Sequence, residues 1–447
     1  MTATAGQTHL LPSVQRRNVL YVIFDGLVIG LMSAAASFVS VWVVRLGASP
    51  FWVSLLSSLP STVALVMTIP WSEFAGRQRR PQRVFAFARL AVHVVYPLVA
   101  IVPFFLRDEW AARVIIVIWS LSAFPSSLSN MMFTLVMGHA VPPERRAFLM
   151  SRRWSFLGVA KLIALPIISQ LIERLPFPHG YQLAFAINAL LAGAAFYCAT
   201  QLQVEPSKPA KPAPKEHIAD RLRSGAAEIW AHKSFLVFVG GRALLHLGLV
   251  LVSAVVPIYW VDHLNASDTW IGYFNAALSA STLVSYFPWV RIKRKFGTRW
   301  TLVPAVVGIA FYPALLALAR APAAVLPVIA FNGLAGAGIN LAFFDALLEA
   351  CPRDKEARFV AINMTAIHLM GVIGPPIGAA LLGAMRIRWV LVVGTLVALT
   401  GVAVFAFVQP GKWANRPAKN AGSPLRSDKS TNEQTIVPDA QQSGMSK

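Results

Sequence analysis

Charged residues are scarce in this sequence. Only 13% of its 447 residues are Asp, Glu, Lys or Arg, where a soluble protein carries roughly a quarter. Hydrophobic residues make up 56% of the chain. Apolar segments of about 20 residues, the length needed to cross a bilayer, recur from one end to the other. A soluble globular fold is therefore excluded, and the chain is predicted to be an integral membrane protein.

Cysteine is rare as well. The two cysteines, Cys198 and Cys351, fall on or at the end of predicted membrane spans, and no Cys/His metal spacing accompanies them. We therefore expect neither a disulfide framework nor a metal site. The first residues also lack the short apolar core and small-residue cleavage site of a signal peptide, so the first apolar segment is predicted to be a retained helix.

Enzyme signatures are missing. The sequence has no GxxxxGK[ST] nucleotide loop, no HExxH and no GxSxG in a strand–turn–helix context. A membrane-embedded transferase would need an acid or histidine cluster at one membrane face, which the sequence does not contain. We expect no enzyme and no cofactor. The energy for any transport would then come from a gradient of protons or other ions, or from the solute's own gradient.

Acidic residues are outnumbered by basic ones, 19 against 40, for a net charge of +21. Such a balance can indicate nucleic-acid binding, but here the positions of the basic residues follow the predicted sides of the membrane. With twelve predicted spans and both ends on one side, 30 of the 40 Lys and Arg lie on that side, seven on the other and three within spans. This asymmetry predicts cytoplasmic termini in the plasma (inner) membrane and no nucleic-acid partner.

The spans divide into two equal sets. We predict a cytoplasmic tail over residues 1–17, a six-helix bundle over 18–202, a Pro- and Lys-rich cytoplasmic linker over 203–234, a second bundle over 235–408, and a polar, disordered cytoplasmic tail over 409–447.

The two bundles are related in sequence. ASPFW at 48–52 and ASDTW at 266–270 stand 218 residues apart, and the same offset matches Gly30 with Gly248 and Trp42 with Trp260. Over residues 30 to 71, 14 of 42 positions are identical without a gap. Both halves begin on the same side, which predicts a parallel repeat about an axis along the membrane normal.

This layout resembles the major facilitator superfamily of transporters over all twelve spans. The family's loop motif, G-x-x-x-D-R-x-G-R-R, follows spans two and eight. SEFAGRQRRP (72–81) keeps part of it but has Gly76 at the Asp position, and VRIKRKFGTR (290–299) has Arg294 there. The resemblance implies an all-α membrane fold of two pseudo-symmetric six-helix bundles, and solute transport by alternating access.

A few ionisable side chains lie deep in the predicted spans, where a charge is expensive unless it is paired or faces a water-filled cavity. Asp25, in FDGLVIGLM (24–32), resembles the span-one pattern of several drug exporters and is the candidate proton carrier. The alternative is a structural ion pair with Arg89, Lys161 or Arg242. The predicted substrate and proton pathway contains Asp25, Lys161, Arg242, His246, Arg89, His93, Asn275 and Asn340.

Two features qualify this pathway. Arg89 lies near the cytoplasmic end of its span, so its side chain could extend outward to the membrane surface. For His93 and His368, the alternative to proton transfer is a neutral imidazole packed among other side chains. Inward cations favour a carboxylate- or phosphate-bearing solute, whereas the exporter similarity favours amphipathic drug efflux. The sequence leaves both open.

A cytoplasmic gate is predicted where acids near the end of span ten come within reach of the basic loop after span eight. The predicted gate residues are Asp345, Glu349, Glu73, Arg77, Arg291 and Lys295. The alternative is permanent surface ion pairs of little energetic value.

These observations predict a secondary active transporter of a small organic solute, proton-coupled and functional as a monomer, with the solute and the lipid bilayer as its partners. The alternative class is a non-transporting membrane sensor or assembly factor with the same fold. Within transport, the alternatives are a drug-efflux antiporter and an anion or metabolite carrier.

Overall fold

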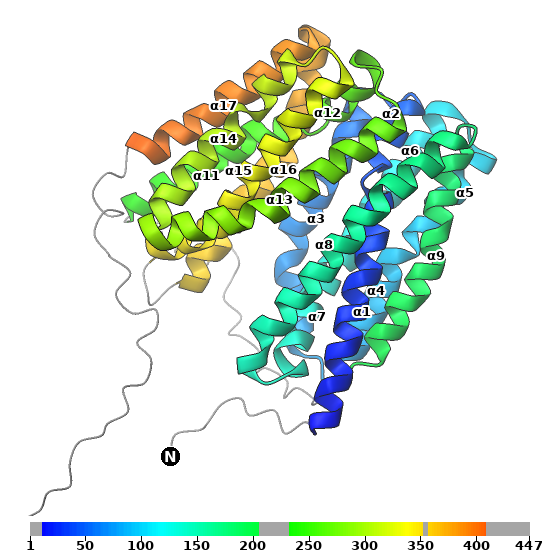
Figure 1. Ribbon diagram of the computed structural model, residues 1–447, viewed down its shortest axis with the longest axis vertical. Helices are drawn as coiled ribbons and strands as arrows, with labels where there is room; N and C mark the ends of the chain where they lie inside the picture. Colours follow the sequence, from blue (N-terminus) through cyan, green and yellow to red (C-terminus); the bar gives the residue numbers. More distant parts are fainter. Residues whose placement is uncertain (1–10, 205–231, 352–355, 408–447) are drawn as a thin grey trace, which may run out of the picture. The chain divides into compact units, whose positions relative to one another are not determined.

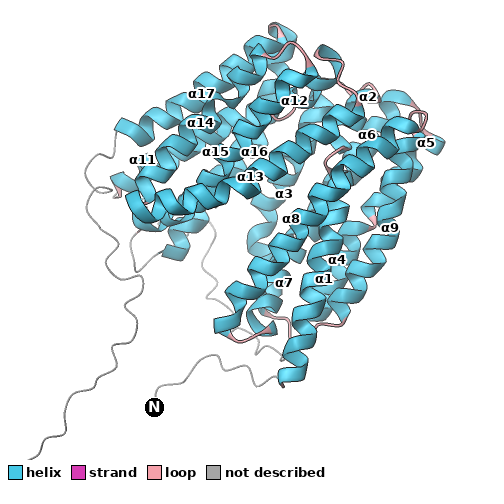
Figure 2. Cartoon of the chain, viewed as in Figure 1, coloured by secondary structure: helices cyan, strands magenta, loops and turns pink. Residues whose placement is uncertain are grey.

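The computed structural model describes residues 11–204, 232–351 and 356–407. Within these residues the chain is built of helices joined by short loops, and they contain no strand (Figure 2). The predicted linker and C-terminal tail lie almost wholly outside the described residues, as does most of the predicted N-terminal tail. The first helix begins at Pro12, six residues earlier than the predicted span.

The first half contains six spans, three of them broken into two helices. The first span, Pro12–Arg45, has 34 residues and consists of α1 followed by α2. The helices are α1 (Pro12–Ala36), α2 (Val39–Arg45), α3 (Pro50–Gly76), α4 (Pro81–His93), α5 (Val95–Phe105), α6 (Asp108–Leu121), α7 (Ala123–Ala140), α8 (Pro143–Arg174) and α9 (His179–Thr200).

The second half repeats this order. Its first span ends in a π-helical turn, η1, which follows a short helix. The elements are α11 (Lys233–Leu251), α12 (Val255–Ile258), η1 (Tyr259–His263), α13 (Asp268–Phe296), α14 (Thr298–Leu318), α15 (Pro322–Ala350), α16 (Glu356–Ala384) and α17 (Ile387–Phe407).

Eleven of the described spans are long and apolar enough to cross a membrane. The twelfth, α13, has 29 residues but is more polar, with Asn275 and several Ser and Thr residues along it and a basic end. It packs against α8, α14 and α15, so other helices rather than lipid cover much of its surface. The predicted fold class, twelve spans in two six-helix bundles, is confirmed.

The two halves use the same neighbours. The first span of each half packs on the fifth and sixth, as α1 does on α8 and α9 and α11 does on α16 and α17. The second span packs on the fourth, as α3 does on α7 and α13 on α15. Equivalent packing in both halves is the three-dimensional counterpart of the sequence repeat.

The halves meet through two crossed pairs, α3 with α16 and α8 with α13. Both contacts are close: a Cβ at Gly272 of α13 would lie 2.3 Å from the Ser169 hydroxyl oxygen of α8, and a Cβ at Gly371 of α16 would lie 2.4 Å from that of Ser61 in α3. From the contact near Gly272, α8 and α13 run in diverging directions (Figure 1).

We call the end of the bundles that holds Arg45, Tyr181 and Asp268 the distal end, and the end where α1 and α11 begin the proximal end. One apolar cluster crosses between the halves and includes Trp42 and Phe185 of the first half with Tyr259 and Phe274 of the second. Separate clusters fill each half toward the proximal end. One surrounds Phe85 and Met137, and the other Phe235, Phe359 and Leu347.

Candidate functional site

The carboxylate of Asp25 in α1 lies between two guanidinium groups. Arg89 Nη2 of α4 donates to both carboxylate oxygens, at 2.6 and 2.8 Å. Arg153 of α8 donates to Oδ2 through Nε at 3.2 Å and Nη2 at 3.0 Å. The three residues are 5%, 8% and 4% exposed. The carboxylate therefore joins three helices of the first half in a buried group with one net positive charge.

Local sequence explains how the second arginine reaches Asp25. The next residue is Gly26, and a Cβ there would lie 2.7 Å from the Arg153 carbonyl oxygen. Only a glycine allows α8 to approach α1 this closely. The Arg153 guanidinium also lies over the ring of Phe133, 4.4 Å from its centroid. His93, one turn after Arg89, is buried, and neither ring nitrogen has a hydrogen-bond partner among the described residues.

Of the ion-pair partners considered for Asp25 from the sequence, the structure shows Arg89, and it adds Arg153. Arg89 does not extend toward the membrane surface but is the buried partner of Asp25. Arg153 was not among the predicted site residues because residues 144–153 were assigned to a basic loop, whereas α8 begins at Pro143. Whether Asp25 carries a proton remains a prediction.

Lys161 and Arg242 differ from this group. Both are half-buried, and neither forms an ion pair within the described residues. The Arg242 guanidinium of α11 lies over the ring of Phe343 in α15, 4.0 Å from the centroid. His246, one turn further along α11, lies within electrostatic range of both Arg242 and His368 of α16. Three of the predicted cationic or imidazole groups are thus gathered in the second half.

The two predicted asparagines have limited roles in this conformation. Asn275 is half-buried, and its amide nitrogen donates to the carbonyl of Ile271 in its own helix at 2.9 Å. Asn340 is exposed and donates to the Tyr286 hydroxyl at 3.4 Å.

The predicted gate residues do not join the halves. Asp345 of α15 pairs with Lys293 of α13, inside the second half. Glu73 and Arg77 face each other within α3 at 3.8 Å. Glu349 accepts a hydrogen bond from Thr298 at 3.4 Å. Arg291 and Lys295 are exposed. These two ion pairs and this hydrogen bond each lie within one half of the described structure.

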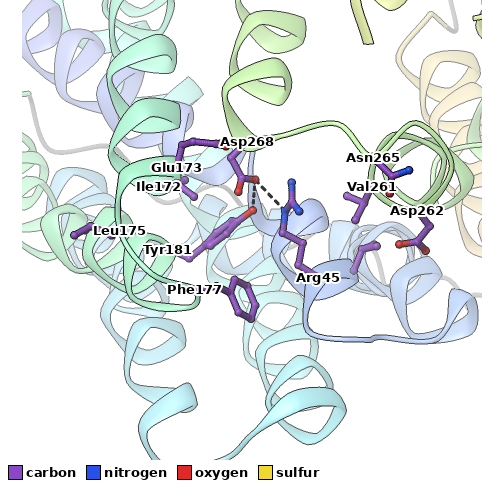
Figure 3. Close-up of a pocket in the computed structure, with 11 residues that line it drawn as sticks. Arg45, Ile172, Glu173, Leu175, Phe177, Tyr181, Val261, Asp262, Asn265 and Asp268 are labelled. Atoms are coloured by element: carbon purple, nitrogen blue, oxygen red, sulfur yellow. Dashed lines mark hydrogen bonds and ion pairs between the residues drawn. The ribbon is translucent and has the colours of Figure 1, made fainter. Parts of the chain in front are cut away.

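The polar contact between the halves lies at the distal end instead. Asp268, the first residue of α13, receives a hydrogen bond from Arg45 Nε at 3.1 Å and another from the Tyr181 hydroxyl. Arg45 Nη2 also donates to the Ala266 carbonyl at 2.8 Å, and Glu173 accepts from the Thr269 amide at 3.1 Å. Figure 3 shows Arg45 and Tyr181 converging on the Asp268 carboxylate. We call Arg45, Tyr181 and Asp268 the distal latch.

A pocket of about 700 Å³ lies beside the distal latch, lined by Arg45, Glu173, Tyr181, Asp262, Asp268 and six other residues. Tyr181 stacks on Trp42, which fixes the phenol ring that reaches the latch. Among the residues that the structure describes, no group of three His, Cys, Asp or Glu side chains is placed to hold a metal ion.

The sequence contained a signal for this latch. In the aligned pair ASPFW and ASDTW, Asp268 stands where the first half has Pro50, and Arg45 stands where the second half has His263. The repeats carry different side chains at both equivalent positions. The Arg45–Asp268 ion pair therefore has no symmetric counterpart between His263 and Pro50. A comparison of charges between the repeats would have drawn attention to both residues.

The described helices thus form a polytopic membrane protein of two duplicated six-helix bundles that meet at one end. The family model of the major facilitator superfamily matches residues 238–437 of this chain, in agreement with the resemblance inferred from the sequence.

Solved structures of transporters share the fold of the described helices. The nucleoside transporter NupG is 12% identical with a TM-score of 0.64, covering 88% of this chain and 99% of its own. The xylose transporter XylE from E. coli, in an inward-open conformation, is 12% identical with a TM-score of 0.61, covering 89% of this chain and 96% of its own.

A sequence relative is also found. The staphyloferrin B transporter of Staphylococcus aureus is 25% identical over 162 residues. The match spans 35% of this chain and 38% of that relative.

Proposed function

We propose that this protein is a secondary transporter that moves a small organic solute across the membrane by alternating access. The observation that carries the proposal is the difference between the two ends. At the distal end the halves share an apolar cluster and the distal latch. Toward the proximal end each half has its own cluster. Two parallel repeats that meet at one end can rock about a site between them.

Each half is also bonded within itself, which favours movement as a rigid body. Asp25 holds α1, α4 and α8 of the first half together. The Lys293–Asp345 pair holds α13 to α15 in the second. With both termini in the cytoplasm, as the basic loops predict, the conformation would be closed to the outside. We expect the protein to reside in the plasma membrane and to work as a monomer.

The driving ion is proposed to be the proton. Asp25 remains the candidate carrier because it is the acid that lies deepest in the described spans. To take up a proton it would have to release one of its two arginines, so protonation would be linked to a change in the packing of α1 against α4 or α8.

The solutes named for similar proteins differ widely: a nucleoside and xylose for two structural neighbours, and staphyloferrin B for the sequence relative. This spread supports solute transport and leaves the class of solute to be argued from the side chains. A drug-efflux antiporter is the second candidate, supported by the similarity of FDGLVIGLM to exporters.

The test is solute flux in proteoliposomes that contain the purified full chain, with and without an imposed pH gradient. We expect flux of at least one solute from a broad panel, faster with the gradient, and loss of the gradient's effect in Asp25→Asn measured on its folded fraction. Flux that ignores the gradient would remove proton coupling and leave transport. No flux for the whole panel would favour the sensor or assembly-factor alternative.

A further inference from the structure

The charges deep inside the membrane do not balance. Among the described spans, the charged residues that lie seven or more positions from both span ends are Asp25, Arg89, Arg152, Arg153, Lys161 and Arg242. Five are cations and one is an acid, which leaves an excess of four positive charges. A charge at such depth is tolerated where it is paired, hydrated or able to bind a ligand.

The buried group around Asp25 accounts for part of this excess but offers no room for a ligand. Both guanidiniums are bonded to the carboxylate, and α8 is pressed against α1 at Gly26 and Gly30, where a Cβ would lie 2.7 and 2.3 Å from backbone oxygens of α8. Arg152 is exposed, and its guanidinium lies over the ring of Phe148, 4.3 Å from the centroid. The half-buried charges that form no ion pair within the described residues are therefore those of Lys161 and Arg242.

Arg242 is held in a way that leaves its donors available. One face of its guanidinium lies on Phe343, and stacking of this kind orients the planar group without using its N–H donors. His246 follows one turn later on the same helix face. His368 is on α16, which packs against α11. No carboxylate in the described residues pairs with any of the three.

The position of His368 relates this group to the space between the halves. Gly371, one turn further along α16, makes the close contact with Ser61 of α3 in the first half. His368 therefore lies one helical turn from a contact between the halves. The group of Arg242, His246 and His368 thus belongs to the second half and borders the interface.

Lys161 is the corresponding cation of the first half. It lies one turn before Leu165 of α8, whose carbonyl faces Gly272 of α13 at 3.4 Å from a Cβ placed there. Lys161 therefore lies one helical turn from the contact that α8 makes with α13 of the second half. It has no ion-pair partner within the described residues.

We propose that these unpaired cations bind an oxyanion, so that the transported solute carries carboxylate or phosphate groups. Arg242, with its planar N–H donors, is the primary contact, and the imidazoles of His246 and His368 supply further donors. Lys161 attracts the same anion from the first half. This inference rests on the proposed transport function and selects against an amphipathic cation, which would meet only positive charge at these positions.

Direct binding tests the inference separately from transport. The purified full chain in detergent is titrated with succinate, citrate and inorganic phosphate at constant ionic strength, with glucose as the neutral probe and spermidine as the cationic one. Binding is measured by calorimetry and by the midpoint of thermal unfolding. We expect at least one of the three anions to bind and raise the midpoint, and neither glucose nor spermidine to do so. The phosphate and carboxylate arms distinguish the two oxyanion chemistries.

Variants locate the site. Arg242→Gln should weaken anion binding about tenfold to a hundredfold, because hydrogen bonds to charged groups contribute about 1.5–3 kcal/mol each. Arg242→Lys keeps the charge but loses the planar fork, and should give an intermediate loss. Lys161→Gln should weaken binding less. Lys233→Gln, which removes the same charge from the exposed first turn of α11, is the matched control and should bind as the original chain does.

Three results would overturn the inference: no binding by any of the three anions, anion binding that survives both Arg242 substitutions, or binding of spermidine instead. Anion binding without flux in proteoliposomes would keep this site and remove the transport proposal. Flux of a neutral or cationic solute would keep transport and remove the anion site.

Discussion

The two halves of this protein share one sequence pattern, but the first contains a buried group of paired charges, beside the unpaired Lys161, and the second contains none within the described residues. In the first half, Asp25 is bonded by Arg89 and Arg153, and all three are buried. In the second half, Arg242 is half-buried, and no carboxylate of the described residues pairs with it. Charges of the first kind hold helices together. Charges of the second kind remain available for a ligand, so the comparison separates a structural function from a binding one.

The distal latch shows a second difference between the repeats. Arg45 and Asp268 occupy positions whose counterparts, His263 and Pro50, cannot form the same pair. His263 instead stacks on Tyr259 and accepts from Arg388 within the second half. The duplicated fold therefore has the Arg45–Asp268 ion pair once, at a place where its symmetry would allow two.

The largest expected effect is on stability, and it distinguishes the paired charges from the unpaired ones. Asp25→Asn leaves two buried guanidiniums without a counter-charge, and breaking such a group destabilises by about 3–5 kcal/mol. Arg242→Gln leaves no charge unpaired and should change the thermal unfolding midpoint little. The measurement is the unfolding midpoint of both variants in the same detergent. Equal midpoints would mean that the two halves do not differ in this way.

A second effect concerns two glycines at equivalent positions of the repeats, Gly30 and Gly248. A Cβ at Gly30 would lie 2.3 Å from the Leu157 carbonyl oxygen of α8, and one at Gly248 would lie 2.4 Å from backbone atoms of α17. The same glycine thus permits contact with the fifth span in one half and the sixth in the other. Because backbone atoms must shift to make room for the methyl group, the free energy of unfolding of each Gly→Ala variant should fall by about 1–3 kcal/mol.

Gly193→Ala is the control for this pair, since nothing lies within 4 Å of a Cβ at that position. Its helix-propensity gain should leave the unfolding midpoint unchanged or slightly raised. If Gly30→Ala proved as harmless as Gly193→Ala, the close approach of α1 to α8 would be refuted.

The smallest expected effect is on the balance between conformations. Asp268→Asn removes the partly exposed ion pair with Arg45. The equilibrium between the closed and open distal ends should then shift toward the open form by about 1 kcal/mol, or about fivefold. The hydroxyls of Ser57 and Ser253, 3.4 Å apart across the halves, provide the measurement. With both replaced by cysteine, oxidative cross-linking should slow about fivefold when Asp268→Asn is added.

The control for the latch is Asp345→Asn, which removes an ion pair within the second half only. It should leave the cross-linking rate unchanged. A slower rate in this variant, or an unchanged rate in Asp268→Asn, would show that the distal latch does not set the balance between closed and open distal ends.

Much of the fold could be predicted because its signals are local. Each span is a continuous apolar run, and the repeat is visible at a fixed offset of 218 residues. The candidate cations were found for the same reason, since a charge within an apolar run stands out. Arg153 and Asp268 were missed because both lie near predicted span ends, where charged residues are ordinary and only their partners make them special.

The amino-acid sequence by itself determined the number of spans, their duplication and the presence of more cations than acids inside the membrane. Hydropathy and repeat spacing are properties of the chain, and they need no knowledge of how helices turn. Only the tertiary structure decided that Asp25 is bonded to two arginines, that Arg242 pairs with no acid of the described residues, and that the halves are joined through Arg45 and Asp268. Those pairings depend on the rotation of each helix about its axis and on contacts between residues 64 to 223 positions apart, which no local pattern encodes.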